Sequence, residues 1–234
     1  MRKIAFLFLS FFIIACSNNQ DNLIVKVNIK DLKKGTVYLK KVKDTSLVTV
    51  DSIIINGNPK FELQCSIDTP EVYYLYLDKN SAIRDRITFF ADKGVTEINT
   101  TLKNFAYDAQ IKGSEQQKTL EEYKSIISKI NDRKLDLIKE TFEAKKAGDL
   151  DQIGSLEKEA NNIMKRRYLY TVNFAINHGD SEVAPYLALS EIYNAKFSLL
   201  DTINKSLTPK VKSSKYGKEL NEFIEKIKAD ENIK

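Results

Sequence analysis

Few residues in this chain have the types and spacing that chemistry requires. The 234 residues contain two cysteines, Cys16 and Cys65, and one histidine, His178. Thiol–disulfide exchange needs a CxxC pair and a zinc site needs several Cys or His ligands, and the sequence offers neither. It also contains no phosphate-binding glycine loop, no HExxH and no GxSxG. We therefore expect no catalytic residue, no metal site and no cofactor, and we do not expect an enzyme.

The remaining polar candidates have structural explanations. His178 precedes Gly179 at a predicted helix end, where a cation interacts favourably with the helix dipole, and no nucleophile or orienting acid is singled out beside it. Asp51-Ser52 lies within a predicted strand, where Asp is disfavoured, so we expect a bulge or a cross-strand hydrogen bond there. Two weaker hypotheses are a calcium site and a carbohydrate-stacking surface, formed by Asp78, Asp85 and Asp92 and by Tyr73, Tyr74 and Tyr76, respectively.

The clearest chemical signal lies at the N-terminus. Arg2 and Lys3 precede an apolar run over residues 4–14, which Ala15 and Cys16 follow. A basic start, a short apolar segment and a small residue before a cleavage point are typical of a secretory signal peptide. The run is too short to span a membrane, which takes about 20 residues. Residues 1–15 are thus predicted to be a signal peptide.

Ile13-Ile14-Ala15-Cys16 resembles the lipobox of bacterial lipoproteins. The resemblance implies cleavage between Ala15 and Cys16 and acylation of Cys16 by a diacylglyceryl group and a further chain such as palmitate. Each buried methylene adds about 0.8 kcal/mol, so several chains anchor a protein firmly. Residues 16–22 would be the lipidated cysteine and a tether. Ser17 implies sorting to the outer rather than the inner membrane of the cell envelope, facing the periplasm or the surface.

The composition is that of a folded protein with one large domain or two small ones. Hydrophobic residues make up 42% of the chain, and the formal net charge is +5, two charges of which belong to Arg2 and Lys3. No basic block is long enough to act as a nucleic-acid-binding arm. We expect no nucleic-acid partner.

Residues 23–113 are predicted to form β-structure. Short runs of branched and aromatic residues are separated by turns, and Asn56-Gly57 is the strongest hairpin signal. After that turn Phe61, Leu63 and Cys65 alternate with polar residues, so Cys65 is expected to face the core as a small apolar side chain. About eight short strands indicate an antiparallel β-sandwich or open barrel.

Residues 114–234 are predicted to be helical, which makes the fold class α+β. Ser114 and Gln117 form a capping-box signature, and apolar residues then recur at helical spacing to about residue 146. Gly148-Asp149 interrupts the pattern before a second long helix that ends at His178-Gly179. Two long helices with a short break suggest a helix hairpin, and three shorter helices are expected after it.

Several short segments carry a wider resemblance. The segments are Gly35-Thr-Val-Tyr-Leu39, Val50-Asp-Ser52, Asn56-Gly57 with Phe61, Phe89-Phe90, Ile111-Lys-Gly-Ser114 and Ser214-Lys-Tyr-Gly-Lys218. Together they are similar to the domain of unknown function that precedes the thioredoxin-like domain in TlpA-like thiol–disulfide oxidoreductase lipoproteins. The sequence contains no CxxC and no thioredoxin-like domain, so the redox activity of that family is not implied. The resemblance implies an accessory domain.

Three functions remain open at this point. The first is a non-catalytic envelope lipoprotein that binds a protein partner or a ligand. The second is a module that binds glycans or other small ligands, motivated by the tyrosines. The third is a detached accessory domain that acts in trans with a thioredoxin-like oxidoreductase.

Overall fold

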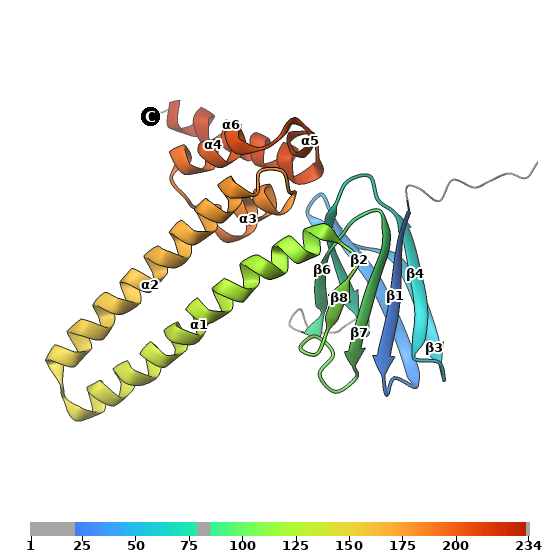
Figure 1. The fold of residues 1–234 in the computed structure, drawn as a ribbon, viewed down its shortest axis with the longest axis horizontal. Helices are drawn as coiled ribbons and strands as arrows, with labels where there is room; N and C mark the ends of the chain where they lie inside the picture. Colours follow the sequence, from blue (N-terminus) through green and yellow to red (C-terminus); the bar gives the residue numbers. More distant parts are fainter. Residues whose placement is uncertain (1–21, 79–84, 233–234) are drawn as a thin grey trace, which may run out of the picture.

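The structure is a computed structural model that describes residues 22–78 and 85–232. Two four-stranded sheets come first in the described chain, and six helices follow. Figure 1 shows the sheets at one end of the molecule and two long helices that project away from them. Ala15 and Cys16 lie outside the described residues. The α+β class and the eight strands expected from the sequence are confirmed.

The strands divide equally between the two sheets. Sheet A has the order β4-β1-β7-β8, and sheet B has the order β3-β2-β5-β6. Sheet A contains β1 (Asn22–Lys30), β4 (Lys60–Ser66), β7 (Gly94–Thr101) and β8 (Gln110–Lys112). Sheet B contains β2 (Lys34–Lys43), β3 (Ser46–Asn56), β5 (Glu71–Tyr76) and β6 (Ile87–Ala91).

Apolar side chains from both sheets share one core. Leu23, Val25 and Val27 of β1 are buried together with Leu39 of β2 and Phe89 of β6. The alternation of β1 explains its contribution, since every second residue faces the same side of a strand. We call β1–β8 the two-sheet region.

Two details differ from the sequence-based expectation of local antiparallel hairpins. β1 and β7 pair in parallel, whereas the other described strand pairs are antiparallel. The turn at Asn56-Gly57 does form, with Gly57 at a φ of 93°, but it does not join two paired strands. β3 pairs with β2 in sheet B, while β4 pairs with β1 in sheet A. The turn therefore carries the chain from one sheet to the other.

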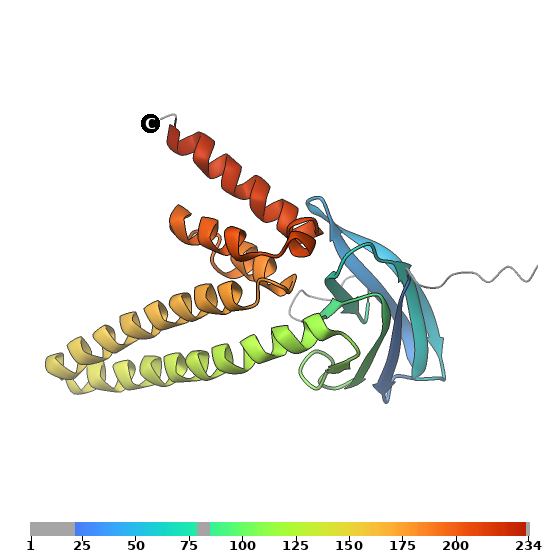
Figure 2. The same ribbon diagram turned by 45° about the horizontal axis from the view of Figure 1, so that its top comes forward.

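The two long helices form a unit that we call the arm. It consists of α1 (Glu115–Ala147) and α2 (Leu150–Asn177), which run side by side in opposite directions (Figure 1, Figure 2). Gly148 ends α1 with a φ of 70°, a left-handed conformation that glycine adopts without a steric penalty. Asp149 then caps α2 by accepting a hydrogen bond from the backbone N–H of Gln152.

The remaining helices pack against the base of the arm. They are α3 (Val183–Glu191), α4 (Phe197–Ser206), α5 (Pro209–Lys212) and α6 (Lys215–Asn232). Their core contains Ala188, Leu200, Ile203 and Leu220, and Val172 of α2 joins it. The sequence predicted three short helices here. The structure adds the short α5, with Pro209 in its first turn, and extends the last helix to Asn232.

Helices α1 and α6 pack on sheet B, on the face that points away from sheet A and along the β6 edge. The backbone N–H of Phe90 on β6 donates to Oε1 of Gln117 at 2.8 Å, and the N–H of Val72 on β5 donates to the Tyr216 hydroxyl at 3.0 Å. Val72, Phe90 and Tyr216 share a third apolar cluster with residues of α1, α2 and α3. β5 is thus covered on both faces, which agrees with its run of apolar residues on both sides.

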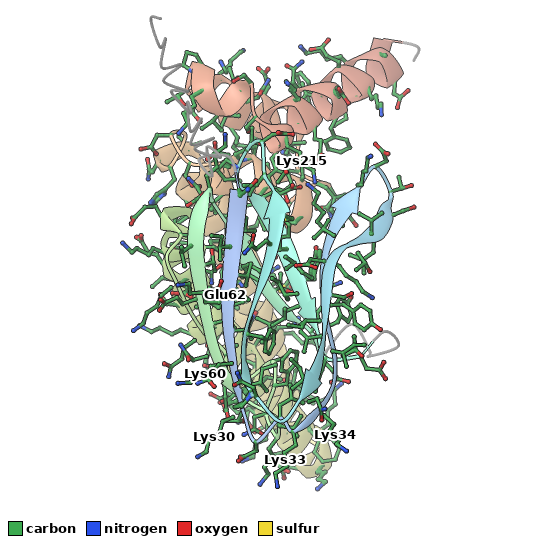
Figure 3. The ribbon with its side chains drawn as sticks, turned by 90° about the vertical axis from the view of Figure 1, so that its right-hand side faces the viewer. Lys30, Lys33, Lys34, Lys60, Glu62 and Lys215 are labelled. Carbon is green, nitrogen blue, oxygen red and sulfur yellow. The ribbon has the colours of Figure 1, made fainter. Side chains whose placement is uncertain are left out.

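A buried ion network reinforces this attachment. Glu71, which is only 5% exposed, accepts from Nζ of Lys41 at 2.6 Å and from Nζ of Lys215 at 2.7 Å. Lys215 also donates to the backbone carbonyl of Val42 at 2.8 Å. Figure 3 shows Lys215 at the end of the sheets next to the helices, away from Lys30, Lys33 and Lys34. The network joins β2, β5 and α6.

Candidate interaction surface on the helical arm

The residues that the sequence singled out lie far apart. Ala15 and Cys16, the predicted cleavage and lipidation site, are outside the described residues. Cys65 packs against the core of the two-sheet region, as predicted. Burial raises the pKa of the Cys65 thiol above its ordinary value, which disfavours the reactive thiolate.

His178 and Asp51 both have structural roles. His178 follows α2, with its Nδ1 2.9 Å from the carbonyl oxygen of Phe174 and its ring stacked on the Phe174 ring. Oδ2 of Asp51 accepts a hydrogen bond from the backbone N–H of Gln64 at 2.7 Å, which links β3 to β4 across the two sheets. The pairing of β2 with β3 also shifts register beside Asp51. The expected bulge and cross-strand hydrogen bond are both confirmed.

The tyrosines of β5 do not form an open stacking surface. Tyr73 is fully buried in the core, and Tyr76 is buried with Nζ of Lys40 4.3 Å from its ring centre. Tyr74 packs against the helices, and the guanidinium of Arg86 lies 3.9 Å from its ring centre. These contacts confirm that the aromatic side chains belong to the packing of sheet B.

The outer face of sheet A is polar and shallow. Lys26 and Glu62 form an exposed ion pair at 3.7 Å, and Asn28 donates to Asn99 at 3.3 Å. Figure 3 shows Glu62 midway along this face and Lys60 toward the end where Lys30 lies. Charges of both signs that contact one another and water are typical of a solvated surface.

The arm, in contrast, exposes large apolar side chains. Ile138 and Phe142 of α1 are 58% and 57% exposed. The arm has its own small core, in which Leu137, Leu156 and Ile163 are buried, with Ala144 close to the tip. Two helices can bury only the sides that face each other, so their flanks stay open. Leu135, Leu150, Met164 and Leu169 are exposed on the arm as well.

Ile138 and Phe142 lie in a groove between the helices that we call the distal groove. Its volume is about 410 Å³, and Leu137, Thr141 and Ala160 contribute to its lining. Charged side chains stand at its rims: Lys134 and Lys145 on α1 and Glu157 on α2. Nζ of Lys146 lies 4.5 Å from the Phe142 ring centre and pairs with Glu143 at 3.8 Å. The groove is therefore apolar inside and mainly cationic at its edges.

A second groove, the proximal groove, lies on the opposite flank of the arm. It has a volume of about 530 Å³ and includes Lys129, Arg133 and Arg166. Ile138 follows Lys129 by nine residues, about two and a half helical turns, so the two side chains point to opposite sides of α1. Arg133 is engaged there, since it contacts Glu140 at 2.6 Å and Glu159 at 2.9 Å. The contact with Glu159 links α1 to α2, whereas Glu140 lies on α1 itself.

The sequence contained a signal for this surface that reasoning about core positions overlooked. Leu137 and Ile138 both lie in the segment whose apolar residues recur at helical spacing, although adjacent residues point about 100° apart on a helix. Only Leu137 is buried against α2. Ile138 and Phe142 are four residues apart and form a second, outward stripe.

Two other kinds of site are not found among the described residues. None of their helices has the length and apolar character needed to cross a membrane. They also contain no group of three or more His, Cys, Asp or Glu side chains placed to hold a metal ion. For Asp92, the calcium hypothesis is replaced by a contact with α1, because its Oδ2 accepts from the Ser114 hydroxyl at 2.9 Å.

The fold and surface define an α+β protein with a projecting helical arm. Residues 23–120 are similar to a protein family described only as a domain of unknown function (DUF4369). The match spans the two-sheet region and the start of α1, and it stops before both grooves. No curated protein and no solved structure matches the chain.

Proposed function

We propose that this protein is a lipid-anchored binding module of the bacterial cell envelope, held at the outer membrane through Cys16. The signal-peptide pattern and the lipobox-like Ile13-Ile14-Ala15-Cys16 support the anchor. We further propose that residues 23–113 form a β-sandwich domain and residues 114–234 a helical region. The sequence motifs favour binding over catalysis.

The arm is the surface proposed to bind a partner protein. The observation that carries this proposal is the distal groove, in which Ile138 and Phe142 remain exposed between lysines. Exposed apolar patches with a polar rim are typical of protein interaction sites. An amphipathic helix fits a groove between two helices, because its apolar side chains recur every three to four residues.

The charges at the rims define the chemistry of the partner. Lys134 and Lys145 line the distal groove against the single acid Glu157, while Lys146 beside Phe142 is paired with Glu143 at 3.8 Å. A partner helix with acidic residues beside its apolar stripe would complement these charges. A second copy of this chain would not, because a symmetric contact would bring the same cationic groove against itself.

Site-specific photo-crosslinking in the native envelope tests the proposal. A photoreactive phenylalanine analogue replaces Phe142 in the full-length lipidated protein, and the crosslinked peptide is identified by mass spectrometry. We expect one defined partner peptide that is helical in pattern, apolar on one side and acidic beside it. The Ile138→Asp substitution should abolish this product. The matched control, Ile54→Asp on β3, changes a residue that is 80% exposed outside the arm and should leave it intact.

Two outcomes would contradict the partner proposal. One is a crosslink between two copies of this chain, and the other is a product that persists in the Ile138→Asp variant. A crosslinked peptide from a thioredoxin-like oxidoreductase would identify the partner as a redox protein. It would then support the relation to TlpA-like proteins that the sequence motifs suggest.

The anchor has a separate test. The Cys16→Ala variant should accumulate as an uncleaved precursor that incorporates no labelled palmitate, because the acylated thiol is absent. An intact-mass measurement shows whether the precursor is cleaved and acylated, and membrane fractionation shows whether the protein stays on the membrane. Normal cleavage with membrane retention in this variant would refute the anchor and leave the arm proposal untouched.

A further inference from the structure

A second site lies where the helices meet the two-sheet region. The cavity there has a volume of about 540 Å³, and small-molecule sites are commonly about 300–1,000 Å³. Asp92, which follows β6, lines one part of it, while Glu182 before α3 and Lys210 of α5 line another. Residues at the ends of strands and the starts of helices, from distant parts of the sequence, thus line one cavity.

Asp92 is held in a fixed orientation. Its Oδ2 accepts from the Ser114 hydroxyl at 2.9 Å and from the backbone N–H of Glu115 at 3.0 Å, so it tethers the start of α1. Its other oxygen, Oδ1, is buried and has no hydrogen-bond partner. The helix start accounts for only one of the two oxygens.

Glu182 is the more unusual group. It is 1% exposed, and its Oε2 is buried without a hydrogen-bond partner. It occupies the N-cap position of α3 but makes no side-chain cap, and the Ser181 hydroxyl accepts from the N–H of Val183 instead. The carboxylate hydrogen-bonds to its own backbone N–H, but Oε2 stays buried without a partner, which is costly and which helix capping does not explain.

The electrostatics of the cavity favour a hydrogen-bond donor that carries positive charge. Burial raises the pKa of Glu182, a hydrogen bond from its own backbone N–H and the charge of Lys210 lower it, and the carboxylates of Asp92 and Asp180 raise it further. Four carboxylates line the cavity against two lysines, Lys93 and Lys210, so the lysines offset only part of the negative charge. An ionised carboxylate can only accept hydrogen bonds, so an occupant must donate to Asp92 Oδ1 and Glu182 Oε2.

We infer that this cavity binds a small molecule through a primary ammonium group. An ammonium group has three N–H donors and one positive charge, which suits two acceptors that lack partners on residues lining one cavity. A bound metal is less suitable, because calcium takes six to eight oxygen ligands and the described residues hold no cluster of three ligating side chains. This inference does not depend on the arm.

Calorimetric titration of the full-length lipidated protein in nonionic detergent tests the inference. The probe is ethanolamine, a compact primary ammonium compound. Choline is the matched control, because it has the same charge and hydroxyl group but no N–H donor. Potassium chloride at equal ionic strength controls for charge alone. We expect heat of binding with ethanolamine only. In a parallel thermal-unfolding measurement, only ethanolamine should raise the unfolding temperature.

Two substitutions locate the binding to the cavity. Glu182→Gln and Asp92→Asn keep the side-chain shapes and should each weaken ethanolamine binding about tenfold or more, the usual effect of losing a charge-assisted hydrogen bond. Glu97→Gln, on the outer face of sheet A, should bind like the unmodified protein. Glu182→Gln should fold normally, since it removes a buried charge.

The inference is overturned if ethanolamine does not bind, or if choline or potassium binds equally well. It is also overturned if Glu182→Gln leaves the affinity unchanged while its unfolding temperature shows a folded protein. In the first case the two oxygens would be satisfied by water or by a shared proton.

Discussion

Glu71 shows how much one carboxylate contributes to holding the helices on the sheets. It accepts from both Lys41 and Lys215, and its side chain is almost completely buried. Breaking a buried pair commonly costs about 3–5 kcal/mol, and because both lysines keep some contact with water we expect Glu71→Gln to cost about 2–3 kcal/mol. Chemical denaturation measures this loss.

The exposed pair of Lys26 and Glu62 is the natural comparison for Glu71. The Glu62→Gln variant should lose less than about 1 kcal/mol, as surface pairs do. If the two variants were equally stable, the buried network would contribute nothing beyond a surface contact. The double variant Glu71→Gln with Lys215→Met separates the Glu71–Lys215 interaction from the other contacts of the network.

Glu182 should make stability depend on pH in a defined direction. Its pKa is raised in the folded state, whereas the unfolded carboxyl has its ordinary pKa of 4.5. Above that pH the unfolded chain loses the proton first, so the free energy of unfolding falls as the pH rises, until folded Glu182 ionises too. The Glu182→Gln variant lacks this slope.

The measurement is the difference in unfolding free energy between the Glu182→Gln variant and the unmodified protein, taken at a series of pH values above 4.5 without added amine. The difference should grow with pH in favour of the variant. Other acids with raised pKa, such as Glu219, are present in both proteins and cancel. A difference that stays constant with pH would mean that Glu182 titrates normally.

The surroundings of a single side chain could be predicted from the sequence where the neighbouring residues determine them. The alternation around Cys65 placed it against the core, and the oddity of Asp in a strand led to the hydrogen bond from Gln64. Glu71 was not found, because its partner Lys215 lies far away in the sequence, and Glu182 was not found, because only the packing of the fold buries it. Lys215 is brought to Glu71 only by the packing of α6 on sheet B.

The arm should behave as a weakly stabilised element. Its distal core is small, and Leu137 is one of its few buried residues. Leu137→Ala creates a cavity that commonly costs about 2–5 kcal/mol, and local opening needs less free energy than global unfolding. We therefore expect faster amide hydrogen exchange over the distal parts of α1 and α2, with β1 and β5 unchanged.

Leu135→Ala provides the control for that experiment, because Leu135 is exposed on the same helix. Its exchange pattern should match the unmodified protein. Faster exchange throughout the two-sheet region in Leu137→Ala would contradict the independence of the arm. It would mean that the arm and the sheets unfold as one unit.

Elements with a strong local signal were predictable, and their partners were not. Ser114 and Gly148 mark the ends of α1 as expected, since capping is decided by neighbouring residues. The capping box itself is incomplete. The Gln117 side chain accepts from Phe90 on β6 instead of closing back on the helix start. Likewise Asn56-Gly57 specified a turn, but the core decided which sheet each flanking strand joined.

The whole molecule depends on a few contacts between helices and sheets, and Tyr216 makes one of them. Its hydroxyl accepts from the N–H of Val72 at 3.0 Å in a buried setting. Tyr216→Phe leaves that N–H without a partner, which should cost about 1–3 kcal/mol. Denaturation followed by circular dichroism measures the loss, and exchange of the Val72 amide should quicken. An unchanged Val72 amide would show that another group satisfies it.

The parallel pairing of β1 with β7 has a consequence for the order in which the chain folds. Neighbouring strands such as β2 and β3, or β5 and β6, can pair as soon as both are made. In contrast, Leu23 of β1 pairs with Gly94 of β7, which is made much later. Non-local contacts form slowly, because a long loop must close first. The pairing of β1 is thus completed only when β7 arrives, and until then the edge of β1 opposite β4 stays open to misassociation. Refolding should therefore show a slow final phase in which protection of the β1 amides appears together with that of β7.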